Sequence, residues 1–138
     1  MTERRGREFV DLASYLREVT EETNPTRVVL ESTCGCRATA FLLEADAAEG
    51  CARRVCQACG AEAFLGDSEE FWSQAEPEQV RCDCDAEVFE IGVGYSFRAD
   101  DEVSWLTVGS RCLACGLMTT PVDWKIDYAP TEHLFEKT

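Results

Sequence analysis

The sequence predicts a mainly β fold of the small α+β class, built from antiparallel β hairpins with an N-terminal helix and short helices. The first observation behind this prediction is the alternation of apolar with polar or small residues over 87–98 and again over 103–111. The second is that helical periodicity is confined to short stretches, the longest of which lies at the N-terminus. At 138 residues the chain is long enough for one ordinary domain or two small ones.

Residues 6–22 are predicted to form the N-terminal helix. Phe9, Leu12 and Leu16 recur at three- and four-residue spacing, with charged residues opposite them. Pro25 ends the element, because the residue before a proline is disfavoured in the helical region. We expect this helix to cover a sheet or seal its edge; docking of a partner is the alternative.

The middle of the chain contains two predicted strands and a predicted helix. RVVLES (27–32) and TAFLLE (39–44) are typical of strands. The segment 66–78 is predicted to be a short helix, because Asp67 can serve as its N-cap and Glu70 stands in capping-box register.

The C-terminal half predicts a hairpin and a further strand. The run 87–98 has one aromatic-rich face, ADDE (99–102) is a turn signal, and 103–111 returns as the partner strand. VDWKIDY (122–128) alternates again, and a last short helix is predicted from Thr131. We interpret these apolar stripes as core.

Eight of the nine cysteines form four pairs in the order C-x-C, C-x-x-C, C-x-C, C-x-x-C. Two cysteines at a tight turn can aim both sulfurs at one point, and a tetrahedral zinc needs four ligands. In a reducing compartment, so many cysteines indicate metal before disulfides. The predicted ligands are Cys34, Cys36, Cys56 and Cys59 for one zinc, and Cys82, Cys84, Cys112 and Cys115 for a second.

Residues around these pairs repeat as well. CGCRATAF (34–41) and CDCDAEVF (82–89) share Ala and Phe at the same offsets, and CQACG in the first copy matches CLACG in the second. Asp67 and Asp123 each stand eight residues past the last cysteine of their copy. We infer an internal duplication.

The inferred duplication divides the chain into an N-terminal helix (1–24), a first repeat (25–78) and a second repeat (79–138). We expect the two repeats to pack as one unit with a shared core, because each alone is too small to bury much surface.

Alternatives remain for the grouping and for the metal. The pairs could cross between copies, and iron, a [2Fe–2S] cluster or disulfides could replace zinc. Iron sites of the rubredoxin type favour C-x-x-C in both halves, whereas half of these pairs are C-x-C. Four arginines near the pairs could offset the charge of a zinc tetrathiolate: Arg37, Arg54, Arg81 and Arg111.

Cys51 has no counterpart in the second copy. We interpret it as a small side chain near the metal; the alternative is a redox-accessible thiol that competes for zinc or pairs with Cys56.

The framework resembles zinc ribbons of the rubredoxin-like knuckle type, above all in CQACG and CLACG, over residues 34–60 and 82–116. The resemblance implies antiparallel hairpins that clamp a structural zinc, hence a tandem zinc-ribbon-like protein. The departure is C-x-C in each first knuckle. The segment from RCLACG through DWKIDYAPTEHL is also similar to uncharacterised small bacterial proteins of actinobacterial type, which implies no activity.

The formal charge of −14, from 27 acidic and 13 basic residues, argues against nucleic-acid binding, which needs a Lys/Arg surface. The only basic cluster is Arg4, Arg5 and Arg7. No apolar run is long enough for a membrane span, and the N-terminus lacks the apolar region of a signal peptide. We therefore expect a cytoplasmic protein whose partner is another protein.

The residues favour a non-enzymatic protein. Sites of four cysteines are closed, whereas a catalytic zinc keeps an open position. No hydrolase, nucleotide-binding or deaminase motif is present, and His133, the single histidine, is expected at the surface. Carboxylates such as Glu90 and Asp123 are expected on exposed strand faces.

Two structural zinc sites without catalytic groups predict a protein-interaction or regulatory module. The alternatives are a thiol or zinc redox sensor, an iron-tetrathiolate redox carrier and a nucleic-acid binder.

Overall fold

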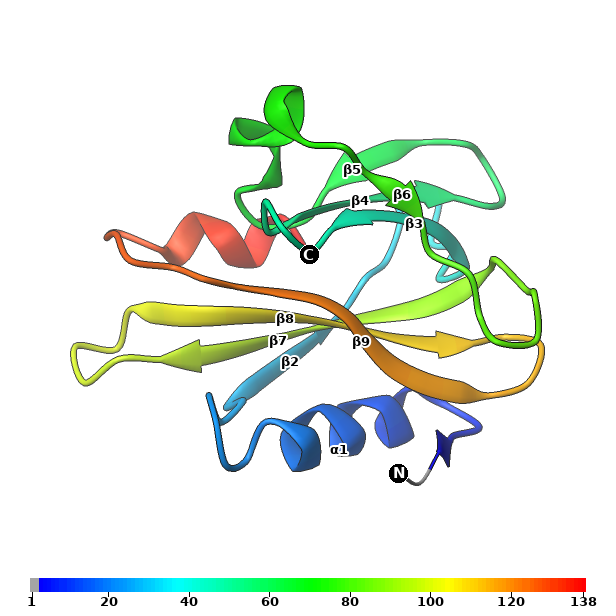
Figure 1. Cartoon of the computed structure of the whole chain (residues 1–138), viewed down its shortest axis with the longest axis horizontal. Helices are drawn as coiled ribbons and strands as arrows, with labels where there is room; N and C mark the ends of the chain where they lie inside the picture. Colours follow the sequence, from blue (N-terminus) through cyan, green and yellow to red (C-terminus); the bar gives the residue numbers. More distant parts are fainter. Residues whose placement is uncertain (1–2) are drawn as a thin grey trace.

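The structure is a computed structural model that describes residues 3–138, and it confirms the predicted mainly β, small α+β class. Figure 1 shows its arrangement. In chain order the strands and the α-helix are β1 (Arg4–Arg5), α1 (Phe9–Val19), β2 (Val28–Glu31), β3 (Phe41–Asp46), β4 (Cys51–Cys56), β5 (Glu62–Phe64), β6 (Glu78–Gln79), β7 (Phe89–Phe97), β8 (Val103–Cys112) and β9 (Leu117–Lys125). The short 3-10 helices are η1 (Ser68–Glu70), η2 (Trp72–Gln74) and η3 (Glu132–Glu136).

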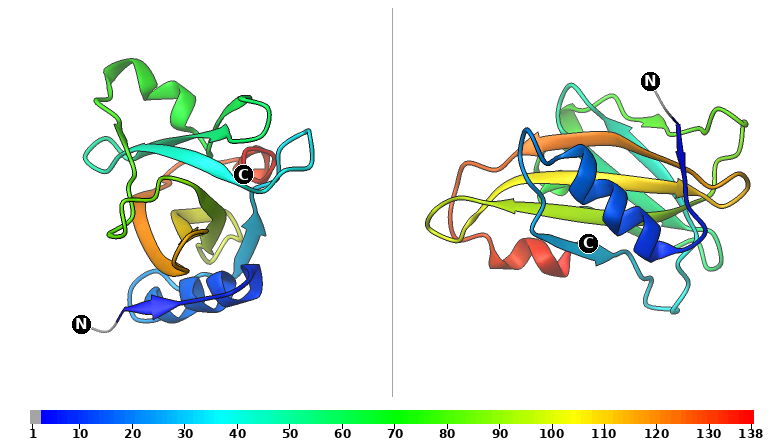
Figure 2. Two further views of the ribbon diagram at one scale, coloured as in Figure 1. Left: turned by 90° about the vertical axis from the view of Figure 1, so that its right-hand side faces the viewer. Right: turned by 90° about the horizontal axis from the view of Figure 1, so that it is seen from below.

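The strands form one antiparallel sheet in the order β1-β9-β8-β7-β3-β4-β5, with β2 paired to β7 and β6 paired to β3. The order can be divided into two three-stranded units, β3-β4-β5 and β7-β8-β9. They meet where Phe41 of β3 pairs with Phe89 of β7. In Figure 1 the β3–β5 unit lies above the β7–β9 unit, and the end-on view in Figure 2 shows the two as separate layers.

Helix α1 covers the face of the β7–β9 unit that lies opposite the β3–β5 unit (Figures 1 and 2). The glycines of β7 and β8 allow this approach: a Cβ at Gly109 would lie 2.7 Å from Leu16, and one at Gly92 would lie 3.0 Å from Phe9. The prediction that the helix covers a sheet is confirmed. The polar face expected for β7 is instead buried, because α1 lies on it.

Helix α1 is shorter than the predicted 6–22. A capping box begins it, in which Asp11 accepts the backbone N–H of Glu8 at 3.2 Å and the Glu8 side chain accepts the N–H of Asp11. Arg4 and Arg5 lie outside the helix and form the edge strand β1 on β9.

The predicted helix over 66–78 is wrong. The segment contains the two 3-10 turns η1 and η2 and then the short strand β6. Asp67 does not cap a helix, because its carboxylate accepts hydrogen bonds from Trp124 Nε1 (3.0 Å) and the Tyr128 hydroxyl (2.9 Å). Tertiary contacts therefore override the local capping signal.

Four other elements differ from the predictions. β9 begins at Leu117 and ends at Lys125, so it covers little more than half of the predicted 122–128 strand and extends five residues before it. β4 and β5 were not predicted, since adjacent Arg53 and Arg54 interrupt any alternation. The predicted C-terminal helix is a five-residue 3-10 helix in which Leu134 is fully buried.

One hydrophobic cluster joins both units. Phe41, Leu43 and Leu65 come from the first, and Phe89 and Tyr95 from the second, and all are at most 2% exposed. The two cysteine loops therefore stand on a common, tightly packed support.

Candidate metal centres

The eight paired cysteines gather into two groups of four, and each group draws on one C-x-C loop and the next C-x-x-C turn. Within each group the sulfur atoms all lie within 4.8 Å of one another. The predicted grouping within each copy is thus the arrangement found, and pairs do not cross between copies. The first centre comprises Cys34, Cys36, Cys56 and Cys59, and the second comprises Cys82, Cys84, Cys112 and Cys115.

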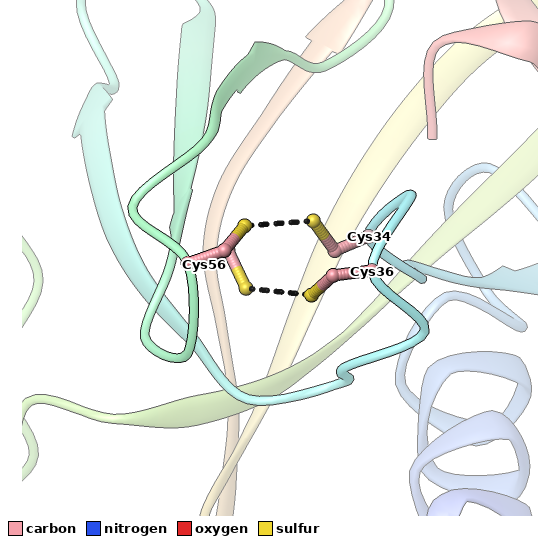
Figure 3. Close-up of side chains that lie close together, drawn as sticks. Cys34, Cys36 and Cys56 are labelled. Carbon is pink, nitrogen blue, oxygen red and sulfur yellow. Dashed lines mark hydrogen bonds between the residues drawn. The ribbon is translucent and has the colours of Figure 1, made fainter.

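The sulfur spacing fits a metal and excludes disulfides. In the first centre Cys34 lies 3.6 Å from Cys59, and Cys36 lies 3.6 Å from Cys56. Figure 3 shows Cys34 and Cys36 pointing from their loop toward the turn that carries Cys56. A disulfide would need about 2.05 Å. A tetrahedron with Zn–S bonds of about 2.3 Å places its sulfurs about 3.8 Å apart.

The second centre repeats this geometry. Cys82 lies 3.5 Å from Cys115, and Cys84 lies 3.6 Å from Cys112. In both centres the first cysteine of the C-x-C pair therefore faces the second cysteine of the C-x-x-C pair. Cysteines at equivalent positions of the two copies thus have the same neighbours in the two centres.

The shared alanine closes each C-x-C loop. The N–H of Cys34 donates to the carbonyl of Ala38 at 2.9 Å, and the N–H of Cys82 donates to Ala86 at 2.8 Å. The residue between the pair and the alanine takes a left-handed conformation in both loops, with φ of 77° at Arg37 and 73° at Asp85. The repeated sequence thus encodes one loop geometry twice.

The glycine after each C-x-x-C pair closes the opposite turn. Gly60 donates its N–H to the carbonyl of Cys56 at 2.9 Å, and Gly116 donates to Cys112 at 2.8 Å. Their φ angles of 78° and 81° are left-handed, which a glycine adopts without strain.

Backbone N–H groups of these turns also favour thiolates. Hydrogen bonds from the N–H groups of Cys59 and Ala58 lower the pKa of Cys56 to about 6, although burial opposes the shift. At Cys112, burial is again opposed by backbone N–H groups, those of Cys115 and Ala114, and the pKa is lowered to about 7. Thiolates are the form that binds a metal, so the turns prepare both cysteines as ligands.

The two centres flank one row of residues across the sheet. Cys56 pairs with Phe41, Phe41 with Phe89, and Phe89 with Cys112. Directly opposed residues share a face of the sheet. With strands about 4.8 Å apart, the Cα atoms of Cys56 and Cys112 lie roughly 14 Å apart.

Of the four predicted arginines, Arg54 lies near the sulfurs of the first centre. Cys34 and Cys56 raise the pKa of Arg54, although its burial lowers that pKa more strongly, so its guanidinium lies near the first centre. Arg81 pairs with Glu87 at 2.7 Å, and Arg111 pairs with Glu90 at 2.8 Å. Arg37 is exposed in the C-x-C loop.

Sequence reasoning missed Arg5, which lies beside the C-x-x-C turn of the second centre: its pKa is raised chiefly by Glu3 and to a smaller extent by the Cys115 sulfur. No local signal could have indicated this contact, since 110 positions separate the two residues. The pairing of β1 with β9 brings them together.

The placement of Cys51 near the metal is wrong, and so is its pairing with Cys56. The two cysteines begin and end the same strand, β4, five residues and roughly 16 Å apart. The Cys51 side chain is fully buried, and burial, with Asp46 and Glu49 nearby, raises the pKa of its thiol. It belongs to the core as an unreactive thiol.

Within residues 3–138 the tetrads are the only groups of three or more His, Cys, Asp or Glu that could hold a metal. His133 is exposed as expected. Glu90 was expected on an exposed face, but it is 8% exposed because α1 covers that face and Arg111 pairs with it.

No protein-family model matches the chain, and no curated protein or solved structure matches it either. Among residues 3–138, no helix has the length and apolar character needed to cross a membrane.

Proposed function

We propose that the protein binds two zinc ions, one in each cysteine tetrad, and serves as a protein-interaction or regulatory module. The observation that carries this proposal is the pair of matched four-thiol groups, each with two sulfur pairs 3.5–3.6 Å apart, all four sulfurs within 4.8 Å of one another, and backbone N–H groups turned toward them. Four thiolates fill a tetrahedral shell, so neither centre would keep a position for substrate. A structural role follows.

We propose zinc and not iron as the bound metal, although four thiolates suit both metals. The preference rests on the C-x-C spacing, since rubredoxin-type iron sites favour C-x-x-C in both halves. Iron would give a coloured, redox-active protein, which is a simple outcome to recognise.

An internal duplication of a zinc-ribbon-like unit supports the same proposal. The units β3-β4-β5 and β7-β8-β9 carry cysteines at matching positions, close their loops with matching hydrogen bonds, and pair through the equivalent residues Phe41 and Phe89. Contact between equivalent residues is typical of a two-fold arrangement. We infer that the two units descend from one.

The charge favours a protein partner with a basic surface. The chain carries a formal charge of −14. Among the described residues, seven of the eleven arginines form ion pairs with carboxylates: Arg4, Arg5, Arg27, Arg53, Arg81, Arg98 and Arg111. A phosphate backbone would meet few free cations.

A thiol or zinc sensor is the second candidate, and the exposure of Cys36, Cys59 and Cys84 favours it. Exposed thiolates in a metal site are accessible to oxidants and chelators, and their modification would expel the metal. The two candidates share the metal and differ in whether it leaves under physiological conditions.

Elemental analysis of the purified protein, combined with a count of reactive thiols, tests the proposal. We expect two zincs per chain and masked tetrad thiols that become reactive on denaturation. Cys36→Ser and Cys84→Ser are a matched pair, and each should reduce the stoichiometry to one zinc. A protein that binds no metal, or iron in place of zinc, would overturn the proposal.

For the interaction role, zinc-loaded protein would be used as bait in an extract of the native host, with a bait of similar charge as the control. A basic protein retained only by the zinc-loaded chain would support the module. Retention of nothing beyond the control would count against it.

A further inference from the structure

We infer that the two metal centres have different tasks: the first is an exchangeable site that releases and takes up zinc, and the second is a guarded, permanent site. This inference rests on the proposed function, because it assumes that both tetrads hold metal. It assigns the regulatory property to one set of residues, namely Cys34, Cys36, Cys56 and Cys59.

The N-terminal arm, residues 3–7, covers the second centre. Arg4 and Arg5 pair with the residues that follow the C-x-x-C turn, Met118 and Leu117. The N–H of Gly6 then donates to the carbonyl of Gly116 at 2.9 Å. The arm therefore lies along the turn that supplies two of the four sulfurs.

Side chains hold the arm in that place. The Arg5 side chain lies beside the C-x-x-C turn, with its Cβ 3.8 Å from where a Cβ on Gly116 would stand. Its guanidinium pairs with Glu3 at 3.0 Å, and its pKa is raised chiefly by Glu3 and to a smaller extent by the Cys115 sulfur. Arg111 donates to the carbonyl of Gly6 at 3.5 Å while it pairs with Glu90 at 2.8 Å, and the side chains of this ion pair are 12% and 11% exposed. A cation beside a thiolate and a buried ion pair behind the arm both oppose opening of the centre.

Among residues 3–138 no segment covers the turn of the first centre in this way, and the equivalent glycines show the contrast directly. A Cβ at Gly116 would lie 2.7 Å from the carbonyl oxygen of Gly6, whereas a Cβ at Gly60 would meet nothing within 4 Å. Gly35, in the C-x-C loop of the first centre, also faces open space.

Burial around the two turns follows the same contrast. Cys59 and its neighbours on both sides, residues 57–62, are all exposed. At the equivalent place in the second copy Cys115 and Gly116 are half-buried, and Leu117 and Met118 are 7% and 3% exposed. A competing ligand can thus approach the sulfurs of the first centre along a side that is closed in the second.

Zinc transfer to a competing chelator tests this inference on the full-length, zinc-loaded protein. With excess 4-(2-pyridylazo)resorcinol we expect two phases of one zinc each, with rates that differ by about tenfold or more, the scale of outer-shell effects on metal sites. N-ethylmaleimide added after the fast phase, followed by peptide mass spectrometry, should find Cys36 and Cys59 labelled, and Cys84 and Cys115 protected. Release at one rate, or earlier labelling of the second centre, would overturn the inference.

A substitution in the N-terminal arm provides a second, independent test. A Cβ at Gly6 would lie 2.6 Å from Asp11 Cβ and 2.9 Å from the Met118 sulfur, so Gly6→Val should displace the arm. It should accelerate the slow phase by about tenfold and leave the fast phase unchanged. Val10→Ala, at a side chain that is 61% exposed, is the control and should change neither phase.

Arg5→Ala removes the cation without a steric clash and should accelerate the slow phase as well, which keeps the test valid if Gly6→Val does not fold. An unchanged slow phase in Arg5→Ala and Gly6→Val would overturn the inference. Absence of bound metal in the wild-type protein would overturn the proposed function itself, so the two failures are distinguishable.

Discussion

Phe41 and Phe89 lie directly opposite each other where β3 pairs with β7, and each also stands opposite the first cysteine of its own C-x-x-C turn. The contact between the two halves of the sheet therefore lies in the same row of residues as one cysteine of each candidate metal centre. Both rings are buried, at 0% and 2% exposed. Each centre thus stands next to a phenylalanine, and that phenylalanine pairs with a residue in the half of the sheet that carries the other centre.

Phe89→Ala should destabilise the whole chain and weaken both centres. Removal of a buried phenylalanine costs about 3–5 kcal/mol of unfolding free energy. Denaturant titration of the zinc-loaded protein measures this loss, and competition with a chelator measures zinc affinity at each site. Phe135→Ala, at a half-buried ring, is the control with a smaller expected loss. An effect on the second centre alone would show that the row does not couple the two.

Gly60→Ala and Gly116→Ala form a matched pair of substitutions. Both glycines are left-handed, so an alanine at either position costs about 1–2 kcal/mol. Gly116→Ala should cost more, because its Cβ would also lie 2.7 Å from a backbone oxygen of the arm. Thermal unfolding of the two zinc-loaded variants provides the comparison, and equal losses would contradict the close packing of the arm.

Asp67→Ala should cost about 2–3 kcal/mol of unfolding free energy, because it leaves the indole N–H of Trp124 and the Tyr128 hydroxyl without their acceptor. Asp123 also accepts an indole N–H, that of Trp105 at 3.0 Å, but at the surface. Asp123→Ala should therefore change the free energy of unfolding by no more than about 0.5 kcal/mol. Denaturant titration separates the two cases; equal losses would contradict a buried network at Asp67.

Stability should fall in alkali because of two tyrosines. Burial raises the pKa of Tyr95 to about 12, and burial together with a hydrogen bond to Asp67 raises the pKa of Tyr128 as well. Since both folded-state values exceed the unfolded value of about 10, the contribution is fully present below about pH 10 and is lost as pH rises toward the folded values. Absorbance titration near 295 nm should show later ionisation in native than in denatured protein. Coincident curves would contradict this prediction.

Cys51 should stay unmodified in the native, zinc-loaded protein. Its thiol is fully buried and its pKa is raised, so iodoacetamide should label it only on denaturation. Cys51→Ala should keep two zincs per chain and lose about 1 kcal/mol of unfolding free energy. Early labelling of Cys51 by mass spectrometry would instead support a redox role for this residue.

Local patterns predicted those parts of the structure that local geometry controls. The alternation over 87–98 predicted β7, and the spacing of Phe9, Leu12 and Leu16 predicted the buried side of α1. The helix predicted over 66–78 failed because its signal, Asp67, is used by side chains 57 and 61 positions away. A helix cap and a tertiary hydrogen bond both require the Asp67 carboxylate as acceptor. The local sequence does not indicate which of the two donors it will bind.

The sequence by itself determined the four cysteine pairs, because short spacings and turn residues such as Ala38 and Gly60 fix where neighbouring sulfurs point, and it predicted that the pairs group within each copy. Only the tertiary structure decided how the centres relate to the rest of the chain. The pairing of Phe41 with Phe89 and the passage of Gly6 over Gly116 join residues that are distant in sequence. Such contacts arise from burial of whole surfaces, and no local spacing records which surfaces will meet.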